Sequence, residues 1–297
     1  MKIGILLVLM FTLLAGCRSR STISFNNDGR VFTELTLPTP TNFRTGSGAP
    51  GHEYWQQRSD HDIQVTLDVE TNTIIGSETI SYTNNSPDEL TYIWLHLEQN
   101  VLRDDSIRSR EGTSSGEKDF TGITISTLDV NGEHVTWHDH VTLAKVDLHE
   151  PLLPSTSLEM VIQWSFPMPV EGGLRMGYDD AYDAGPVWEL AQWIPVPVVY
   201  DDVYGWNTLP YIGRGEFYTN FGEYTVSITV PRDHLVVASG SLVNPADVLT
   251  EEQQDRLHKA MDSDDVIAIR TEDEVGTQES RPEGEGALTW KFHGDDI

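Results

Sequence analysis

Several side chains in this chain have the types and spacing that metal chemistry requires. His149-Glu150 begins like the zinc motif H-E-x-x-H, in which two histidines project from one face of a helix. Leu153 stands where the second histidine would be, and Pro151 disfavours the helix that both ligands need. The sequence therefore predicts a turn at this point and no zinc site.

A second group of histidines lies in the segment HVTWHDH, at positions 134, 138 and 140. In a strand His138 and His140 would share a face, so they could hold a metal with one more ligand. No acidic or cysteine partner stands at a telling spacing. The pattern therefore favours exposed histidines of a hairpin over a metal site.

Paired carboxylates form the third group: Asp179, Asp180 and Asp183, followed by Asp201-Asp202. Such residues could be calcium ligands or a general acid and base, but they also cap turns and loops. Loop capping is the favoured interpretation, because the sequence does not give the separation between carboxylates. The chain contains no P-loop.

The elements that would position these residues are mostly strands. Ile63, Val65, Leu67 and Val69 alternate with polar residues, which indicates a strand with one buried face. Asn131-Gly132 is a strong hairpin signal. Further strands are predicted at 74–84, 90–97, 121–130, 158–166 and 287–293, and as a hairpin of 215–230 with 234–240. Residues 266–270 could form one more strand. Many short strands between turns predict an all-β fold, a β-sandwich.

One short helix is expected near 250–261. Thr250 is a good N-cap, Gln253 stands three residues later as in a capping box, and Glu251 and Glu252 suit the first turn.

The first residues indicate export. Lys2 precedes an apolar run that is too short to span a bilayer, so residues 1–16 are expected to be a signal peptide. Leu14-Ala15-Gly16-Cys17 matches a lipobox, which predicts lipidation of Cys17, the only cysteine. Arg18 replaces the aspartate that commonly retains lipoproteins at the inner membrane. We therefore expect a bacterial cell-envelope protein, anchored by lipid in the outer membrane.

The rest of the chain divides into a polar segment and a folded part. Residues 17–53 are rich in Ser, Thr, Pro and Gly and are expected to be a flexible tether, and 54–297 to be the folded domain. The formal net charge is −28, and such an acidic surface repels phosphate backbones. We therefore expect no nucleic-acid partner.

Four segments carry a resemblance to a known family. They are Tyr54–Leu97, Ala191–Asn207 (AQWIPVPVVYDDVYGWN), Gly213–Pro231 (GRGEFYTNFGEYTVSITVP) and His234–Pro245 (HLVVASGSLVNP). Together they resemble the N-terminal domain of the aminopeptidase N-like zinc metallopeptidases, the gluzincin aminopeptidases. The chain departs from the family near Val196, where relatives often carry a basic residue.

The resemblance implies a saddle-shaped β-sandwich that packs against a thermolysin-like catalytic domain and helps to bind a peptide substrate. It implies that Gln192, and less surely Glu189, helps to hold the free amino group of that substrate. In the family the catalytic domain carries the zinc and its H-E-x-x-H motif, which does not occur in these 297 residues. We therefore expect a truncated product, inactive alone, whose catalytic domain would be supplied in cis or in trans.

A second function class stays open from the sequence. The chain could be a stand-alone surface lipoprotein whose β-sandwich binds peptide or glycan.

Overall fold

The computed structural model describes residues 39–112, 120–169, 175–183, 185–215 and 217–297. The expected signal peptide, Cys17 and the first part of the expected tether lie outside these residues. Within them, no helix has the length and apolar character needed to cross a bilayer.

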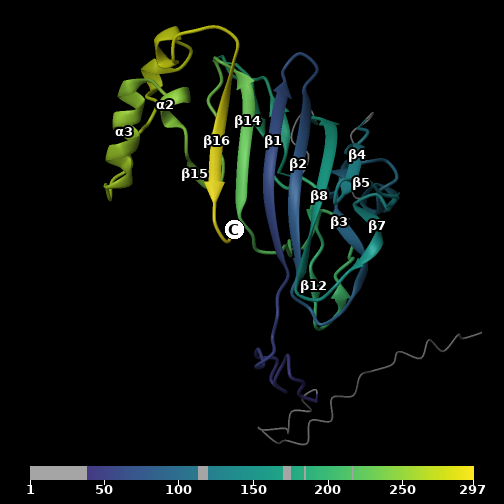
Figure 1. The fold of residues 1–297 in the computed structure, drawn as a ribbon. Helices are drawn as coiled ribbons and strands as arrows, with labels where there is room; N and C mark the ends of the chain where they lie inside the picture. The colour runs from purple at the N-terminus through teal and green to yellow at the C-terminus, as the bar shows by residue number, and fades with distance from the viewer. Residues whose placement is uncertain (1–38, 113–119, 170–174, 184, 216) are drawn as a thin grey trace, which may run out of the picture.

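The largest sheet among the described residues has eight strands, in the order β15-β16-β14-β1-β2-β8-β4-β5 (Figure 1). Its strands are β1 (Arg58–Asp68), β2 (Thr73–Asn84), β4 (Thr124–Val130), β5 (Glu133–His134), β8 (Thr156–Pro167), β14 (Tyr224–Pro231), β15 (Ser241–Leu242) and β16 (Ala287–Gly294).

A second sheet has the order β11-β3-β7-β6 and covers one end of the first. Its strands are β3 (Leu90–His96), β6 (Trp137–Asp139), β7 (Leu143–Leu152) and β11 (Val196–Pro197). Two small pairs join β9 (Gly177–Asp179) to β10 (Val187–Glu189) and β12 (Tyr200–Asp201) to β13 (Gly205–Trp206). The prediction of an all-β, sandwich-like fold is confirmed.

Helical segments are few and short. They are η1 (Glu98–Leu102), α1 (Ile107–Arg110), α2 (Pro245–Val248), α3 (Glu251–Met261), η2 (Glu272–Glu274) and η3 (Gln278–Ser280). In Figure 1 α2 and α3 lie beside the β15–β16 edge of the large sheet. The helix expected near 250–261 is confirmed as α3, and both halves of its Thr250–Gln253 capping box are formed.

The alternation seen in the sequence explains which face of the large sheet is buried. In β1 Ile63, Val65 and Leu67 are buried, while the intervening residues face solvent. The same period places Trp164 and Phe166 of β8 in the core, with ring centroids 5.8 Å apart. This buried face packs against the second sheet at one end and lines a cavity at the other.

The predicted hairpin of 215–230 with 234–240 is wrong. The strand begins only at Tyr224, and its neighbours are β1, in parallel, and β16, in antiparallel. Residues 234–240 form no strand, nor do residues 266–270. Pairing with β1 and β16 places Val226, Ile228 and Val230 on the buried face, which a local hairpin would not provide.

The turn predicted at His149–Glu150 is also misplaced. Strand β7 continues to Leu152, and the turn follows at 153–155, where Ser155 has a φ of 60°. Pro151 is tolerated because the β3–β7 register shifts between Leu90 and Tyr92, so that no regular ladder bond is lost there. The Asn131-Gly132 hairpin turn is confirmed, with φ values of 51° and 81°.

Candidate functional site

The histidines that the sequence singled out are exposed, and three of them each have their own carboxylate. The pairs are His134 Nδ1 with Asp129 Oδ1 at 3.1 Å, His138 Nε2 with Asp147 Oδ2 at 2.8 Å and His149 Nδ1 with Glu133 Oε2 at 3.1 Å. His140 instead packs on Trp94, with ring centroids 5.1 Å apart. These separate pairs do not assemble into a common site.

The aspartates mostly serve the loops. Asp179 Oδ1 accepts a hydrogen bond from Ala181 N, and Asp201 Oδ1 accepts from the amides of Val203 and Tyr204. Asp202 accepts from Arg44 Nε at 2.7 Å, so the described end of the expected tether contacts the domain. Asp180 and Asp183 are exposed. The structure thus assigns capping and anchoring roles to Asp179, Asp201 and Asp202.

Glu189 and Gln192 lie on one short segment but differ in setting. Glu189 is the exposed last residue of β10, opposite Gly177 in β9. Gln192 is half-buried, and its φ of 48° lies in the left-handed region that non-glycine residues seldom adopt. Among the described residues no hydrogen bond or ion pair holds either side chain, so both can accept hydrogen bonds from a ligand.

Large apolar residues fix this segment on both sides of Gln192. The ring of Trp193 packs edge-on against Trp164 at 5.9 Å, and Trp188 lies 5.1 Å from the ring of His234. The indole Nε1 of Trp188 also donates to Asn72 Oδ1 at 3.3 Å. Gln192 is therefore presented by a rigid support, although its own backbone is strained.

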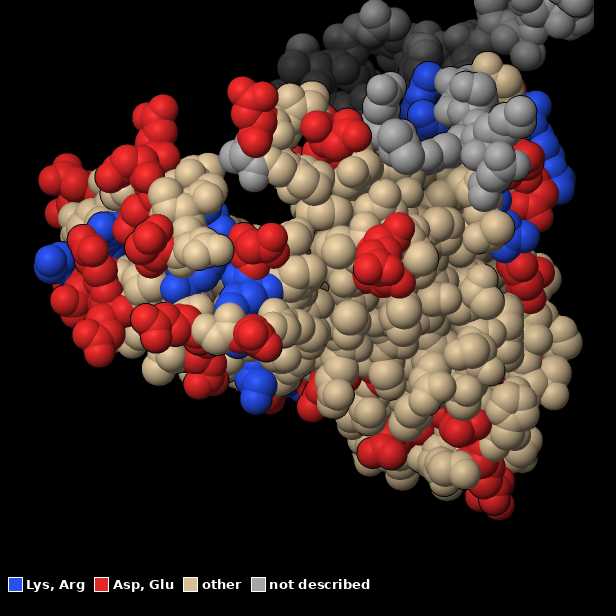
Figure 2. Space-filling view, turned by 90° about the horizontal axis from the view of Figure 1, so that it is seen from above, with Lys and Arg blue, Asp and Glu red and all other residues tan. Residues whose placement is uncertain are grey.

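Beneath this segment is a cavity of about 1420 Å³. Its floor is the buried face of β1 and β14, and its walls come from residues 185–194, 232–239 and 275–284. Three arginines line it: Arg232, Arg270 and Arg281. In the view of Figure 2, basic side chains gather beside a hollow between the helical part and the sheet.

Sequence reasoning missed a buried polar cluster next to this floor. Ser59 Oγ lies 2.7 Å from His61 Nε2, and His61 Nδ1 lies 3.5 Å from Glu78 Oε2. The order serine, histidine, carboxylate is that of a nucleophilic triad. All three residues are at most 4% exposed, so no substrate reaches Ser59 in this structure. The ring of Tyr224 stacks on His61 at 4.5 Å and lines the cavity.

Burial keeps this cluster uncharged near neutral pH. Burial lowers the pKa of His61 to about 4 and raises the pKa of Glu78 well above its usual value. A signal for the cluster was present in the sequence: Ser59 and His61 continue the buried period of Ile63, Val65 and Leu67. Polar residues at the buried positions of a strand pattern therefore indicate a buried polar cluster.

A second buried group lies where β3 runs into η1. His96 Nδ1 lies 3.8 Å from Glu98 Oε1, and burial raises the pKa of Glu98 to about 7 and lowers that of His96 to about 4. Both polar side-chain atoms of the adjacent Gln99 are buried and have no hydrogen-bond partner within the described part of the chain. The cluster is closed to solvent, as the first one is.

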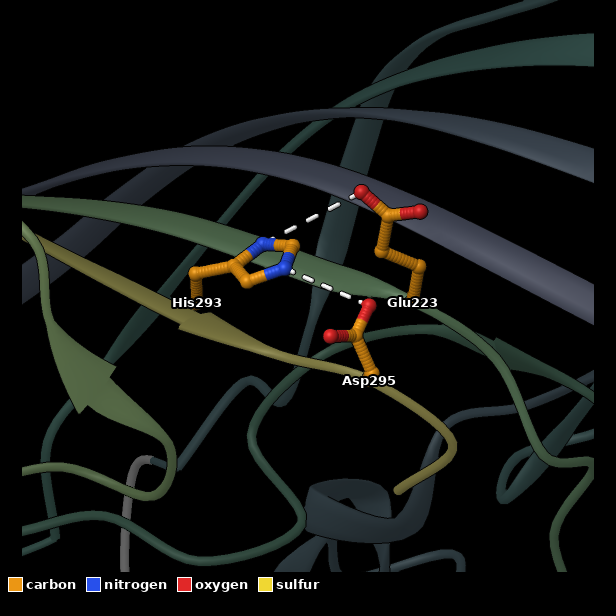
Figure 3. A group of neighbouring side chains, drawn as sticks. All are labelled: Glu223, His293 and Asp295. Atoms are coloured by element: carbon orange, nitrogen blue, oxygen red, sulfur yellow. Dashed lines mark ion pairs between the residues drawn. The ribbon is translucent and has the colours of Figure 1, made fainter.

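One group could approach a cation, and it is drawn in Figure 3. His293 of β16 stands between Glu223 Oε1, 3.9 Å from its Nδ1, and Asp295 Oδ1, 3.3 Å from its Nε2. One ligand atom from each of the three residues lies within 4.8 Å of the other two, so the group could approach a single cation. Both carboxylates are exposed, and exposed acidic groups are common without a metal.

The residues present do not fit a catalytic zinc ion. His149 and Glu150 lie in an extended strand rather than on a helix, and His149 is bound to Glu133. The group at His293 offers one histidine and two exposed carboxylates, which differs from the three-histidine, two-histidine–glutamate and two-cysteine–histidine sets of catalytic zinc sites. No zinc-dependent step is assigned to the described residues.

No protein-family model and no curated protein sequence matches this chain. Among solved structures it is similar to an M1 zinc metallopeptidase mutant from Deinococcus radiodurans bound to a Tyr-Ser-Ala substrate. The identity is 16%, with 80% of this chain and 39% of that chain covered, at a TM-score of 0.39. A two-domain M1 zinc metallopeptidase mutant bound to L-tryptophan has 16% identity, coverage of 82% and 41%, and a TM-score of 0.40.

Yeast LTA4 hydrolase in complex with bestatin has 13% identity, coverage of 63% of this chain and 25% of that chain, and a TM-score of 0.35. The chain therefore spans about two-fifths or less of the length of these solved structures.

Proposed function

We propose that this chain is the N-terminal scaffold and substrate-cleft domain of a membrane-anchored zinc aminopeptidase of the aminopeptidase N-like family. Zinc and the hydrolytic groups would belong to a thermolysin-like catalytic domain, in the same polypeptide or in a separate one. Support comes from the four sequence segments that resemble the family. The segment Ala191–Asn207 among them contains Gln192.

The setting of Gln192 is the observation that carries this proposal. Its side chain has no partner among the described residues, its φ of 48° is strained, and it is flanked by an indole ring packed into the core. Strain of this kind costs about 1–3 kcal/mol and is typical of residues that position a ligand. The amide oxygen of Gln192 would accept a hydrogen bond from the ammonium group of the substrate, and the carboxylate of Glu189 could add a second.

Joining the chain to the catalytic domain of a relative tests the proposal. Gln192→Ala should lower kcat/KM for aminoacyl substrates by at least about tenfold, which corresponds to about 1.4 kcal/mol. Gln192→Gly is the matched control, because glycine relieves the strain at positive φ while removing the same amide. Both variants should lose activity, and the glycine variant should be at least as stable as the parent. Full activity in either variant would remove Gln192 from the site.

Membrane anchoring is the second part of the proposal and rests on the lipobox at Cys17. Mass spectrometry of the membrane-extracted protein should find a diacylated N-terminal Cys17, and Cys17→Ser should release the protein from the membrane. A soluble protein that still begins at Met1 would contradict this.

A further inference from the structure

The cavity above β14 has an apolar floor and a cationic end, and the proposed function uses neither of them. Every second residue of β14 contributes to its floor, namely Tyr224, Val226, Ile228 and Val230. The floor extends roughly 20 Å along the strand, at about 3.3 Å per residue. Just beyond the end of β14, the chain turns up into Arg232. The floor is thus apolar along its length, and cationic side chains stand at one end.

The cations at that end lack the partners that arginines normally have. Within the described parts of the chain, no ion pair joins Arg232, Arg270 or Arg281 to a carboxylate. Their hydrogen bonds go mainly to backbone carbonyls instead: Arg232 to residues 282, 283 and 285, Arg270 to Glu274, and Arg281 to Asp233 and Ser280. Arg281 also donates to the Ser280 hydroxyl. The Nε atoms of Arg232 and Arg270 are buried and have no hydrogen-bond partner among the residues that the structure describes.

The surrounding charges make this arrangement unusual. The protein has a formal net charge of −28, with 47 acidic residues, so carboxylates were plentiful. The acidic residues that line the cavity are Asp233 and Glu283. Asp233 Oδ1 lies 2.7 Å from His234 Nδ1, and Glu283 is exposed. Burial lowers the pKa of Arg270 and, together with the nearby Arg270 charge, that of Arg281. An anion at this end would stabilise the charged forms of both arginines.

We propose that this cavity binds a single-chain amphiphile, with its carboxylate or phosphate headgroup on Arg232, Arg270 and Arg281 and its acyl chain along the floor of β14. Guanidinium groups pair bidentately with either headgroup. Trp188, Leu190 and Trp193 would cover the chain.

A peptide fits the same cavity less well. The floor offers apolar side chains, so the amide groups of a peptide lying on it would lose water without gaining partners. An acyl chain has no such groups. The inference does not depend on the aminopeptidase proposal, because it concerns another face of the segment that carries Gln192.

Calorimetry and native mass spectrometry of the full chain with hexadecanoate, hexadecyl phosphate and methyl hexadecanoate test the proposal. Both anions should bind one to one, and the uncharged ester at least about tenfold more weakly. If only hexadecyl phosphate binds, the headgroup is a phosphate, and if only hexadecanoate binds, it is a carboxylate. Equal binding of ester and acid, or binding of neither anion, would overturn the proposal, as would tighter binding of an apolar peptide.

Arginine variants locate the headgroup. Arg270→Gln should weaken binding of hexadecanoate about fivefold or more, and this residue has the fewest backbone bonds to lose, with one to Glu274 O. Arg110→Gln is the matched control, because Arg110 is exposed on α1 and does not line the cavity. Unchanged affinity in the folded Arg270→Gln protein, or equal losses in both variants, would contradict the assignment. The comparison of acid with ester remains decisive even if a variant fails to fold.

Discussion

His61 and Glu78 face each other inside the large sheet, with His61 Nδ1 and Glu78 Oε2 3.5 Å apart and both side chains fully buried. Because burial favours the uncharged form of each group, this is a neutral pair and not a salt bridge. Its members lie on neighbouring strands, where Ile63 is opposite Glu78 and His61 is opposite Ile80. The pair is a source of pH-dependent stability.

The sign of that dependence differs for the two groups. Folded Glu78 keeps a proton that the unfolded chain releases above its ordinary pKa of 4.5, so the free energy of unfolding falls as the pH rises from there. Folded His61 stays neutral down to about pH 4, whereas the unfolded chain binds a proton below 6.5. This contribution is lost as the pH falls from 6.5 towards 4.

Glu78→Gln should therefore remove the loss of stability that occurs above pH 4.5 and keep the loss below pH 6.5, which arises from His61. We expect the stability of the variant relative to the parent to rise by up to about 1.4 kcal/mol per pH unit above pH 4.5, because the variant has no proton to retain there. Urea unfolding across this range measures it, with Glu159→Gln on the exposed face of β8 as control. Parallel pH profiles for Glu78→Gln and the parent would show that Glu78 is ionised in the folded protein.

Gly76→Ala should destabilise the large sheet by about 1–3 kcal/mol. A Cβ at this position would lie 2.3 Å from the ring of Trp164, which is 2% exposed and cannot move aside. Chemical denaturation measures the loss. Ser77→Ala, one residue along and on the other face of the sheet, should change stability by less than about 0.5 kcal/mol. A Gly76→Ala protein as stable as this control would mean that Trp164 repacks freely.

Thr250→Ala should cost about 1 kcal/mol, since the Thr250 hydroxyl caps Gln253 N at the start of α3. Thr250→Ser keeps the hydroxyl and should retain most of the stability. Thermal unfolding, followed by circular dichroism, compares the three proteins. A serine variant as unstable as the alanine variant would assign the effect to the lost methyl group instead of the cap.

The isolated chain should retain well under one zinc ion after dialysis, because the group of Glu223, His293 and Asp295 supplies a single histidine, and both of its carboxylates are exposed to water. Elemental analysis of the parent and of His293→Ala measures this. One tightly held zinc ion in the parent, absent from the variant, would show that Glu223, His293 and Asp295 together bind the metal.

Local patterns predicted most of the fold. The period of Ile63, Val65 and Leu67 gave β1 its buried face, Asn131-Gly132 gave a turn, and Thr250 with Gln253 gave the start of α3. The failures concern partners distant in the sequence. Nothing local in residues 215–240 reveals that Tyr224 pairs with His61, because the preference for β1 and β16 arises from burial that only the assembled sheet provides.

The candidate site was likewise predicted where local sequence decides and missed where distant segments meet. Exposure of the histidines in HVTWHDH followed from their sequence context, and so did the capping roles of Asp179 and Asp201. The arginine end of the cavity did not, because Arg232, Arg270 and Arg281 come from separate loops that meet only through the fold. The unusual φ of Gln192 is likewise set by its surroundings.

The parallel pairing of β1 with β14 has a consequence for how the chain folds. The bond from Glu223 N to Asp60 Oδ1 at one end of this pairing joins residues 163 positions apart. Contacts of such high contact order close a very long loop and form slowly. During synthesis β1 and β2 can pair as a hairpin long before β14 leaves the ribosome. The edge of β1 that later pairs with β14 therefore stays exposed until then. We expect β14 to dock late, and chaperones that shield strand edges to raise the yield of folded protein.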